Sequence, residues 1–418
     1  MPEKNNTLSI GGIDCVELIA QYGSPLFVYD ASVIQQRFKE LLSCIEYSRV
    51  RLLYACKANT NIAIMSMLKD CGAGLDAVSP GEIFLGLRAG YRPEDILFTG
   101  NNINEDDMLF ALENGVELNI GSLNQLDMYG QIGPDTDITI RINPDIGAGY
   151  HSHCITGGPE SKFGIYFDRV EEVREKASQY NLRIRGIHSH IGSGILDTET
   201  FLAAMKVIQD TARKFEGIEY IDFGGGIGIP YKPGEQRIPL DEFGRRAGTQ
   251  FSEFADEYGN ELTLVLEPGR YLVGESGYLL AKVTNRKQTP THIFIGTDTG
   301  FNHCIRPMAY GATHQIVNAS RMEGEQESVA VCGNLCESGD VFTRNKEGIQ
   351  EQELTRVEHG DILALLNTGA YCFSMASNYN SRLLPAEVLI ENGKSRLIRK
   401  RQEPEDLLRG QSLESVMG

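Results

Sequence analysis

Several features are missing from the 418-residue sequence, and each absence argues against a class of protein. No apolar stretch approaches the ~18 residues that a membrane-spanning helix needs, so we expect no membrane segment. The N-terminus, MPEKNNTLSIGG, has no basic region followed by an apolar run, so no signal peptide is expected. Basic residues number 39 against 57 acidic ones, a formal charge of −18. A surface this acidic repels phosphate backbones, which argues against nucleic-acid binding.

A disulfide framework is also missing. The nine cysteines are odd in number and scattered along a long chain. They are therefore predicted to be reduced thiols, which indicates a cytoplasmic protein. Cys304, Cys332 and Cys372 receive no functional role from the sequence, and small buried apolar side chains are their default interpretation.

From about residue 50 to residue 267, short β-rich runs alternate with segments of amphipathic helical spacing. The β-rich runs are VRLLYA (50–55), GLDAV (74–78), DILF (95–98), VELNI (116–120), ITIRIN (138–143), RIRGIH (183–188), YIDF (220–223) and TLVLE (263–267). Eight such alternations over ~220 residues predict a closed parallel (β/α)8 barrel, the α/β class known as the TIM barrel. An open doubly wound sheet is the structural alternative.

After about residue 280 the pattern changes to strands separated by Gly, Asn and Asp turns. The stretch AEVLIENGKSRLIRK is typical of a hairpin around Asn392-Gly393. We therefore expect a C-terminal, mostly β domain, a β-barrel or sandwich, over residues 281–418, with the barrel over residues 31–280. The N-terminal segment 1–30, which contains the strand LFVYD, is expected to contribute to the β domain.

The residues that follow the barrel strands are candidates for chemistry, because barrel active sites lie at the C-terminal ends of strands. Lys57 follows the first strand, and a partly desolvated lysine there favours the neutral amine that Schiff-base chemistry needs. A strand-end lysine that merely reaches solvent is the alternative.

Two histidine pairs have i, i+2 spacing. His188 and His190 end the sixth strand, and His151 and His153 lie in a glycine-rich loop. We interpret this spacing as a poor one for two ligands of a single ion, so no metal site is predicted for either pair. A single flat imidazole at the barrel mouth is instead suited to stacking on a planar ring.

The last two barrel strands end in a glycine run and a carboxylate. The glycine run Gly224, Gly225 and Gly226 lets backbone N–H groups approach an anion closely. It follows the seventh strand, and the loop at that position commonly holds phosphate in barrels. A plain tight turn is the alternative. Glu267 is suited to keeping a pyridine nitrogen protonated, unless it only pairs with Arg270 across a turn. An amine, an imidazole, a phosphate cradle and a carboxylate at one barrel mouth are what pyridoxal-phosphate (PLP) chemistry requires.

The motifs YACKAN, HSHIGSG, DFGGGIG, EPGRYL, CESGDVF and NTGAYCFSMASNYNSR resemble the alanine-racemase-like (fold type III) PLP decarboxylases. Within this group the resemblance is greatest to the diaminopimelate decarboxylases, and it covers nearly the whole chain. It implies PLP as the cofactor, a PLP-binding barrel with a C-terminal β domain, and a homodimer whose active sites are shared between subunits. The implied reaction converts meso-2,6-diaminopimelate into L-lysine and CO2, the last step of lysine biosynthesis.

The same resemblance implies the site residues. Lys57 forms the Schiff base, His190 stacks on the ring, and Cys336, supplied by the partner subunit, donates the proton after CO2 loss. The implied cofactor contacts are Lys57, Ser79, His190, Ser193, Gly224, Gly225, Gly226, Glu267, Gly269, Arg270 and Tyr371. The implied substrate contacts are Arg270, Arg306, Tyr310, Glu337 and Tyr371.

Other functions of this fold are separated by particular residues. Ornithine and arginine decarboxylases bind a distal cation alone, whereas Arg306 and Glu337 suit a distal carboxylate with an ammonium. Racemases of this fold place an arginine at the pyridine nitrogen, where this chain has Glu267. A non-catalytic binding protein would be expected to lose Lys57 or the glycine run. Gly121 and Thr299 differ from the commoner family residues, which leaves open a specialised substrate similar to diaminopimelate.

Overall fold

The computed structural model describes residues 6–145, 148–149 and 158–412, which form two compact units. One unit comprises residues 34–230 and 234–273, and the other comprises residues 1–33, 231–233 and 274–418. His151 and His153 lie outside the described residues. Within the described part of the chain, no helix combines the length and apolar character needed to cross a membrane.

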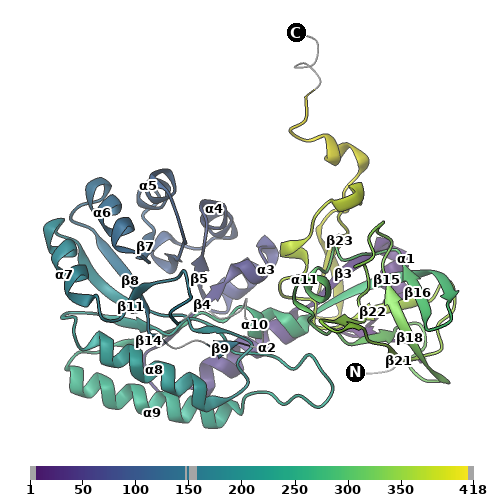
Figure 1. Ribbon diagram of the computed structural model, residues 1–418, viewed down its shortest axis with the longest axis horizontal. Coiled ribbons are helices and arrows are strands. Elements are labelled where there is room, and N and C mark those ends of the chain that lie inside the picture. Colours follow the sequence, from purple (N-terminus) through teal and green to yellow (C-terminus); the bar gives the residue numbers. More distant parts are fainter. Residues whose placement is uncertain (1–5, 146–147, 150–157, 413–418) are drawn as a thin grey trace. The chain divides into compact units, whose positions relative to one another are not determined.

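The first unit is a closed barrel of eight parallel strands (Figure 1). They are β4 (Val50–Ala55), β5 (Gly74–Ala77), β6 (Ile96–Phe98), β7 (Glu117–Ile120), β8 (Asp137–Asn143), β11 (Arg183–His188), β13 (Tyr220–Asp222) and β14 (Thr263–Leu266). Each strand pairs with the next along the chain, β14 pairs with β4, and the pairing of β7 with β8 completes the circle. The predicted barrel is confirmed, and the open-sheet alternative is wrong.

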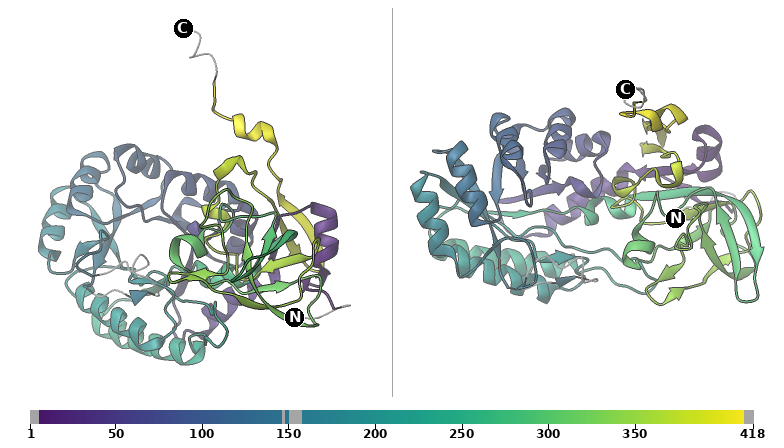
Figure 2. Two further views of the ribbon diagram at one scale, coloured as in Figure 1. Left: turned by 45° about the vertical axis from the view of Figure 1, so that its right-hand side comes forward. Right: turned by 45° about the horizontal axis from the view of Figure 1, so that its top comes forward.

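Helices surround these strands, as the blue-to-green ring in the left view of Figure 2 shows. They are α2 (Ala31–Cys44), α3 (Ile62–Asp70), α4 (Pro80–Ala89), α5 (Glu105–Glu113), α6 (Leu123–Ile132), α7 (Val170–Gln179), α8 (Thr198–Ala212), α9 (Leu240–Tyr258) and α10 (Arg270–Val273). Shorter pieces are η1 (Cys56–Ala58), η2 (Pro93–Asp95), β9 (Ala148–Gly149), β10 (Ile165–Tyr166) and β12 (Gly192–Ser193).

Polar caps explain where several barrel helices begin. The side chains of Asn61, Ser79, Asn104, Ser122 and Asp197 each accept a backbone N–H in the first turn of the helix that follows. Such caps satisfy donors that have no partner inside the helix, and each contributes about 1 kcal/mol. The caps therefore fix the residues at which the loops after the strands end and the helices begin.

The second unit is mostly β-structure. Its strands are β1 (Ser9–Ile10), β2 (Ile13–Asp14), β3 (Leu26–Asp30), β15 (Gly277–Gln288), β16 (Ile293–Thr297), β17 (Ile316–Asn318), β18 (Gln326–Cys332), β19 (Arg344–Asn345), β20 (Gly348–Ile349), β21 (Gln352–Thr355), β22 (Ile362–Leu365), β23 (Ala386–Glu391) and β24 (Lys394–Arg399). Its helical pieces are α1 (Cys15–Tyr22), η4 (Gly274–Ser276), α11 (Arg306–Tyr310), η5 (Phe373–Met375), η6 (Tyr379–Ser381) and η7 (Pro404–Leu408).

The N-terminal strand β3 lies inside the main sheet of this second unit. It pairs antiparallel with β15 and parallel with β23, and all but the last of its residues are buried. The β23–β24 hairpin turns at Asn392-Gly393, both with positive φ, as the sequence predicts. The compact units described above are divided at other residues than the predicted domain boundaries. The boundaries at residues 30/31 and 280/281 therefore remain predictions.

Candidate active site

Five loops at the C-terminal ends of barrel strands carry the predicted cofactor residues. They bring Lys57 after β4, Ser79 after β5, His190 and Ser193 after β11, Gly224 to Gly226 after β13, and Glu267, Gly269 and Arg270 after β14. In a closed parallel barrel these ends meet around one mouth. The residues of this candidate site are therefore spread over the chain from Lys57 to Arg270.

Lys57 lies beside a buried carboxylate. Its Nζ is 3.6 Å from Oδ2 of Asp76 in β5, and the lysine side chain is 39% exposed whereas Asp76 is fully buried. Burial and the charge of Glu267 raise the pKa of Asp76 to about 6 against the opposing effect of Lys57. The amine thus remains reachable at the mouth, while its partner is fixed in the barrel wall.

Glu267 is buried and already bonded on one side. Nε2 of His188 lies 3.0 Å from its Oε2, and burial keeps the pKa of His188 well below its usual value, so the neutral ring donates this hydrogen bond. Burial also raises the pKa of Glu267, which the charges of Lys57 and Arg141 counteract. Its Oε1 has no hydrogen-bond partner within the described residues. A buried acceptor of this kind fits a protonated ring nitrogen.

The protonation of Asp222, at the end of β13, depends on the charge of Glu267. Burial raises the pKa of Asp222 well above its usual value, and the neighbouring Glu267 charge raises it further. Two buried carboxyl groups this close do not both ionise, so Asp222 is the protonated member and Glu267 carries the charge. The potential ligand atoms of His188, Asp222 and Glu267 lie within 4.8 Å of one another.

The glycine run has no room for side chains. A Cβ on Gly225 would lie 2.3 Å from the carbonyl oxygen of Glu267, and one on Gly224 would lie 2.7 Å from that of Ser189. Gly224 and Gly226 also have positive φ, which glycine adopts at little cost. The backbone N–H of Gly225 donates to Nδ1 of His190 at 3.2 Å, so the loop is also tied to the imidazole.

An arginine and a serine are the other candidate phosphate groups. Nη2 of Arg270, at the start of α10, donates to Oγ of Ser193 at 3.2 Å, and Arg270 is buried. An arginine and a hydroxyl beside a glycine loop are the groups that bind a phosphate monoester. Glu267 contacts His188 and Arg270 contacts Ser193, so neither side chain depends on the alternative ion pair between Glu267 and Arg270. The barrel residues therefore fit a pyridoxal phosphate group.

Comparisons with known proteins agree with this geometry. The family model described as "Pyridoxal-dependent decarboxylase, pyridoxal binding domain" matches residues 31–274. Diaminopimelate decarboxylase from Methanothermobacter thermautotrophicus is 46% identical over 416 residues, covering 97% of this chain and 96% of that protein. The chain belongs to the diaminopimelate decarboxylase family.

Solved structures of the family have the same fold along nearly the whole chain. Diaminopimelate decarboxylase from M. jannaschii in complex with L-lysine aligns with a TM-score of 0.91 at 31% identity, covering 100% of this chain and 98% of that one. The Helicobacter pylori enzyme complexed with L-lysine aligns with a TM-score of 0.87 at 34% identity, covering 96% and 99%. Pyridoxal phosphate is accordingly the cofactor, and the chain is an enzyme.

The remaining predicted site residues of this family member lie in the β unit. Arg306 and Tyr310 begin and end α11, Cys336 and Glu337 are exposed after β18, and Tyr371 precedes η5 with a positive φ of 58°. Arg306 is buried, with its guanidinium 4.3 Å above the Tyr231 ring. These residues are described within their own unit, and their roles toward the substrate stay predictions.

Asp76, Arg141 and Asp222 are charged residues of the barrel interior that the sequence reasoning missed. All three are buried, and the charges of Arg141 and Asp222 interact with that of Glu267. The signal that could have found them is a charged residue inside an otherwise apolar strand run, as in GLDAV, ITIRIN and YIDF. Such residues are expensive to bury unless a function uses their charge.

Replacing Asp76 with asparagine is expected to stabilise the cofactor-free protein at neutral pH. The folded-state pKa of about 6 lies above the ordinary value, so the wild type loses stability as pH rises from about 4 through 6. The Asn variant avoids this loss, worth up to about 3 kcal/mol at about pH 7, and the advantage vanishes near about pH 4. Urea unfolding across this pH range measures it, with the exposed Asp168→Asn as the control. An equal advantage at all pH values would contradict the assignment.

Proposed function

We propose that this chain removes one carboxylate from meso-2,6-diaminopimelate as CO2 and releases L-lysine. The observation that carries the proposal is Glu267: a buried carboxylate with one oxygen available at the barrel mouth, where Lys57 also lies. A carboxylate at this position favours carbanion chemistry, whereas the arginine of a racemase would disfavour it. The family resemblance over 97% of the chain supports the same conclusion.

When bound, pyridoxal phosphate supplies a protonated ring that takes up the electrons left by the departing carboxylate. The residues of this chain prepare that step. Lys57 would hold the cofactor through its amine and give way to the substrate amine, and His190 would cover one face of the ring. Glu267 would offer its charge to the ring nitrogen, because His188 donates to one carboxylate oxygen and leaves the other available.

Phosphate binding is assigned to the glycine run with Ser193 and Arg270. Side chains are excluded from the run, so backbone N–H groups can approach an anion closely. The guanidinium of Arg270, held by Ser193, adds a charge-assisted donor. Ser79, which follows β5, accepts the N–H of Glu82 at the start of α4, and a helix N-terminus is a further group suited to an anion. Anchoring the phosphate in this way would hold the cofactor at the barrel mouth that carries Lys57.

The distal head group of the substrate is assigned to the β unit. Arg306 and Tyr310 bind its carboxylate, Glu337 binds its ammonium, and Cys336 donates the proton that replaces CO2. Diaminopimelate carries both distal charges, whereas ornithine and lysine carry only the cation. A matched pair of a buried arginine and an exposed glutamate therefore selects the substrate by charge.

A substrate screen tests the function. Purified enzyme supplied with pyridoxal phosphate is incubated with meso-diaminopimelate, L-lysine, L-ornithine or L-arginine, and released CO2 and the amine product are quantified. We expect L-lysine from diaminopimelate and a kcat/KM at least about 100-fold lower for the other amino acids. Turnover of ornithine at a comparable rate would overturn the substrate assignment, and chiral inversion without CO2 release would favour a racemase.

We further propose a cytoplasmic homodimer in which each active site uses Cys336 and Glu337 of the partner subunit. Both residues are exposed on their own chain, which suits groups completed by another subunit. The free cysteines of the described residues are consistent with a reducing compartment.

Mixed subunits test this arrangement. Lys57→Ala and Cys336→Ala proteins are expected to be nearly inactive alone, because every site lacks one group. After mild dissociation and mixing, heterodimers contain one intact site, and activity should rise to about a quarter of the wild-type value. Each variant dissociated and reassociated alone is the control. A mixture no more active than the sum of its components would show that the sites are not shared.

A further inference from the structure

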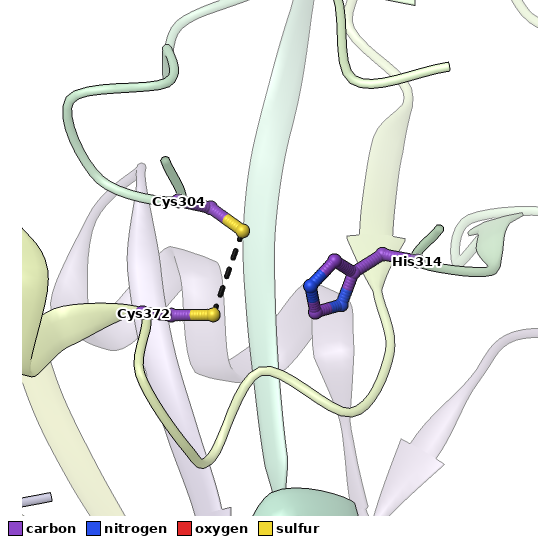
Figure 3. A group of neighbouring side chains, drawn as sticks. All are labelled: Cys304, His314 and Cys372. Carbon is purple, nitrogen blue, oxygen red and sulfur yellow. Dashed lines mark hydrogen bonds between the residues drawn. The ribbon is translucent and has the colours of Figure 1, made fainter. Parts of the chain in front are cut away.

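The β unit contains two buried cysteines whose sulfur atoms face each other. The Sγ atoms of Cys304 and Cys372 are 3.5 Å apart, and neither side chain is exposed. Figure 3 shows both side chains pointing toward one another, with the ring of His314 facing the pair. The two cysteines come from separate segments, one just before α11 and the other just before η5. The family function leaves this pair without a role.

A metal ion is the first ligand that such a group suggests, because the donor atoms of Cys304, His314 and Cys372 lie within 4.8 Å of one another. Both nitrogens of the imidazole are already engaged, however. Nδ1 of His314 donates to the carbonyl oxygen of Leu366 at 2.8 Å, and Nε2 accepts from Nη1 of Arg306 at 2.7 Å. Because a guanidinium stays protonated, the ring offers a metal no lone pair while Arg306 is in place. The geometry favours sulfur chemistry instead.

The two thiols have different proton affinities. Burial raises the pKa of Cys372, but its contact with Cys304, the neighbouring His314 ring and the charge of Arg306 together outweigh burial and lower it. The pKa of Cys304 is raised, first by its hydrogen bond with Cys372 and then by burial. The pair therefore shares one proton, with a thiolate on one sulfur and a thiol on the other. A thiolate beside a second cysteine is the arrangement that oxidises to a disulfide.

We propose that Cys304 and Cys372 are a modification site that a peroxide oxidises to a disulfide, and that this weakens binding of the substrate's distal carboxylate. Closing the sulfurs from 3.5 Å to the ~2.05 Å of a disulfide pulls both segments together. Cys304 lies two residues before Arg306, and Cys372 directly follows Tyr371. The effect on the substrate rests on the proposed function, because that function gives Arg306 and Tyr371 their roles.

The chemistry balances with hydrogen peroxide as the oxidant. The Cys372 thiolate attacks one peroxide oxygen, the O–O bond breaks, and a sulfenic acid and one water form after proton uptake. The Cys304 sulfur then attacks the oxidised sulfur, the S–O bond breaks, and a second water leaves as the S–S bond forms. Starting from one thiolate and one thiol, the two cysteines lose one proton and two electrons, a second proton comes from solvent, and the peroxide is reduced to two waters.

Burial gives the reaction a kinetic signature. Both sulfurs are inaccessible, so peroxide reaches them only when the local structure opens. We expect the rate of disulfide formation to level off at high peroxide concentration. The exposed Cys336 should instead react at a rate that keeps rising with peroxide.

The experiment treats the cofactor-loaded enzyme with hydrogen peroxide, blocks remaining thiols with N-ethylmaleimide during denaturation, and maps the peptides by mass. We expect a linked peptide pair containing Cys304 and Cys372, and a KM for diaminopimelate raised about tenfold, both reversed by dithiothreitol. Cys304→Ala is the matched control, since it cannot form the bond and should show no rise in KM. Oxidation of Cys336 should lower kcat in both proteins equally, which separates the two effects.

Each contrary result overturns a defined part of the proposal. Absence of the linked peptide at saturating peroxide removes the disulfide, and a linked protein with unchanged KM removes its effect on substrate. Zinc binding by the reduced wild type that Cys304→Ala abolishes and that blocks disulfide formation would replace the dithiol by a metal site. If the reduced enzyme makes no lysine at all, the proposed function and its coupling fall, while the peptide map still decides whether the disulfide forms.

Discussion

Replacing Lys57 with alanine is expected to lower kcat/KM for diaminopimelate by about 10⁴ or more, and to remove the absorbance band near ~420 nm of the cofactor-loaded protein. The reason is that the amine 3.6 Å from Asp76 is the group at the barrel mouth assigned to hold the cofactor covalently. Alanine keeps the helical segment η1 but removes that bond. Steady-state kinetics and an absorbance spectrum of the purified variant measure both effects.

Lys57→Arg is the matched control for charge. Arginine preserves the positive charge beside Asp76, so the folded state keeps its electrostatics, but the guanidinium does not form the covalent bond. Both variants are therefore expected to be inactive and to lack the band, with Lys57→Arg closer to the wild type in stability. An arginine variant with substantial activity would mean that Lys57 acts only through its charge.

Replacing Glu267 with glutamine is expected to lower kcat for decarboxylation by about 10² to 10⁴. Glutamine is nearly the same size and still accepts a hydrogen bond from His188, but it carries no negative charge to keep the ring nitrogen protonated. The binding of the phosphate group should change little, because the glycine run, Ser193 and Arg270 are untouched. Kinetics and a cofactor titration distinguish the two quantities.

Glu261→Gln offers a control in the same part of the chain. Glu261 precedes β14, is largely exposed and pairs with Arg49, so its loss should leave kcat unchanged. Exposed pairs of this kind contribute little to stability. If Glu267→Gln and Glu261→Gln behaved alike, the buried carboxylate would have no electronic role, and the argument against a racemase would lose its physical basis.

The barrel was predictable because the local sequence pattern indicates each strand. VRLLYA and RIRGIH are short runs with recurring Val, Ile, Leu or Tyr between segments of helical spacing, so the strands at 50–55 and 183–188 were predicted at the residues where β4 and β11 lie. Closure followed from the number of alternations. The positions of Lys57, Glu267 and the glycine run at strand ends followed from closure, because a barrel collects those ends at one mouth.

The electrostatics around Glu267 were not predictable in the same way. The interaction of Asp222 and Arg141 with that carboxylate depends on how strands far apart in sequence lie around the barrel. The sequence period indicates which face a side chain occupies but not which charges meet there. The sulfur pair was missed for the same reason, since Cys304 and Cys372 are 68 residues apart and come together only through the folded β unit.

The most direct test of the central claim is to trap the cofactor on the protein. Borohydride reduction of the enzyme incubated with pyridoxal phosphate, followed by proteolysis and mass spectrometry, identifies the lysine that holds the cofactor. The account predicts one modified residue, Lys57, in the peptide containing YACKAN. Stable modification of a different lysine, or of none in a folded protein, would contradict it.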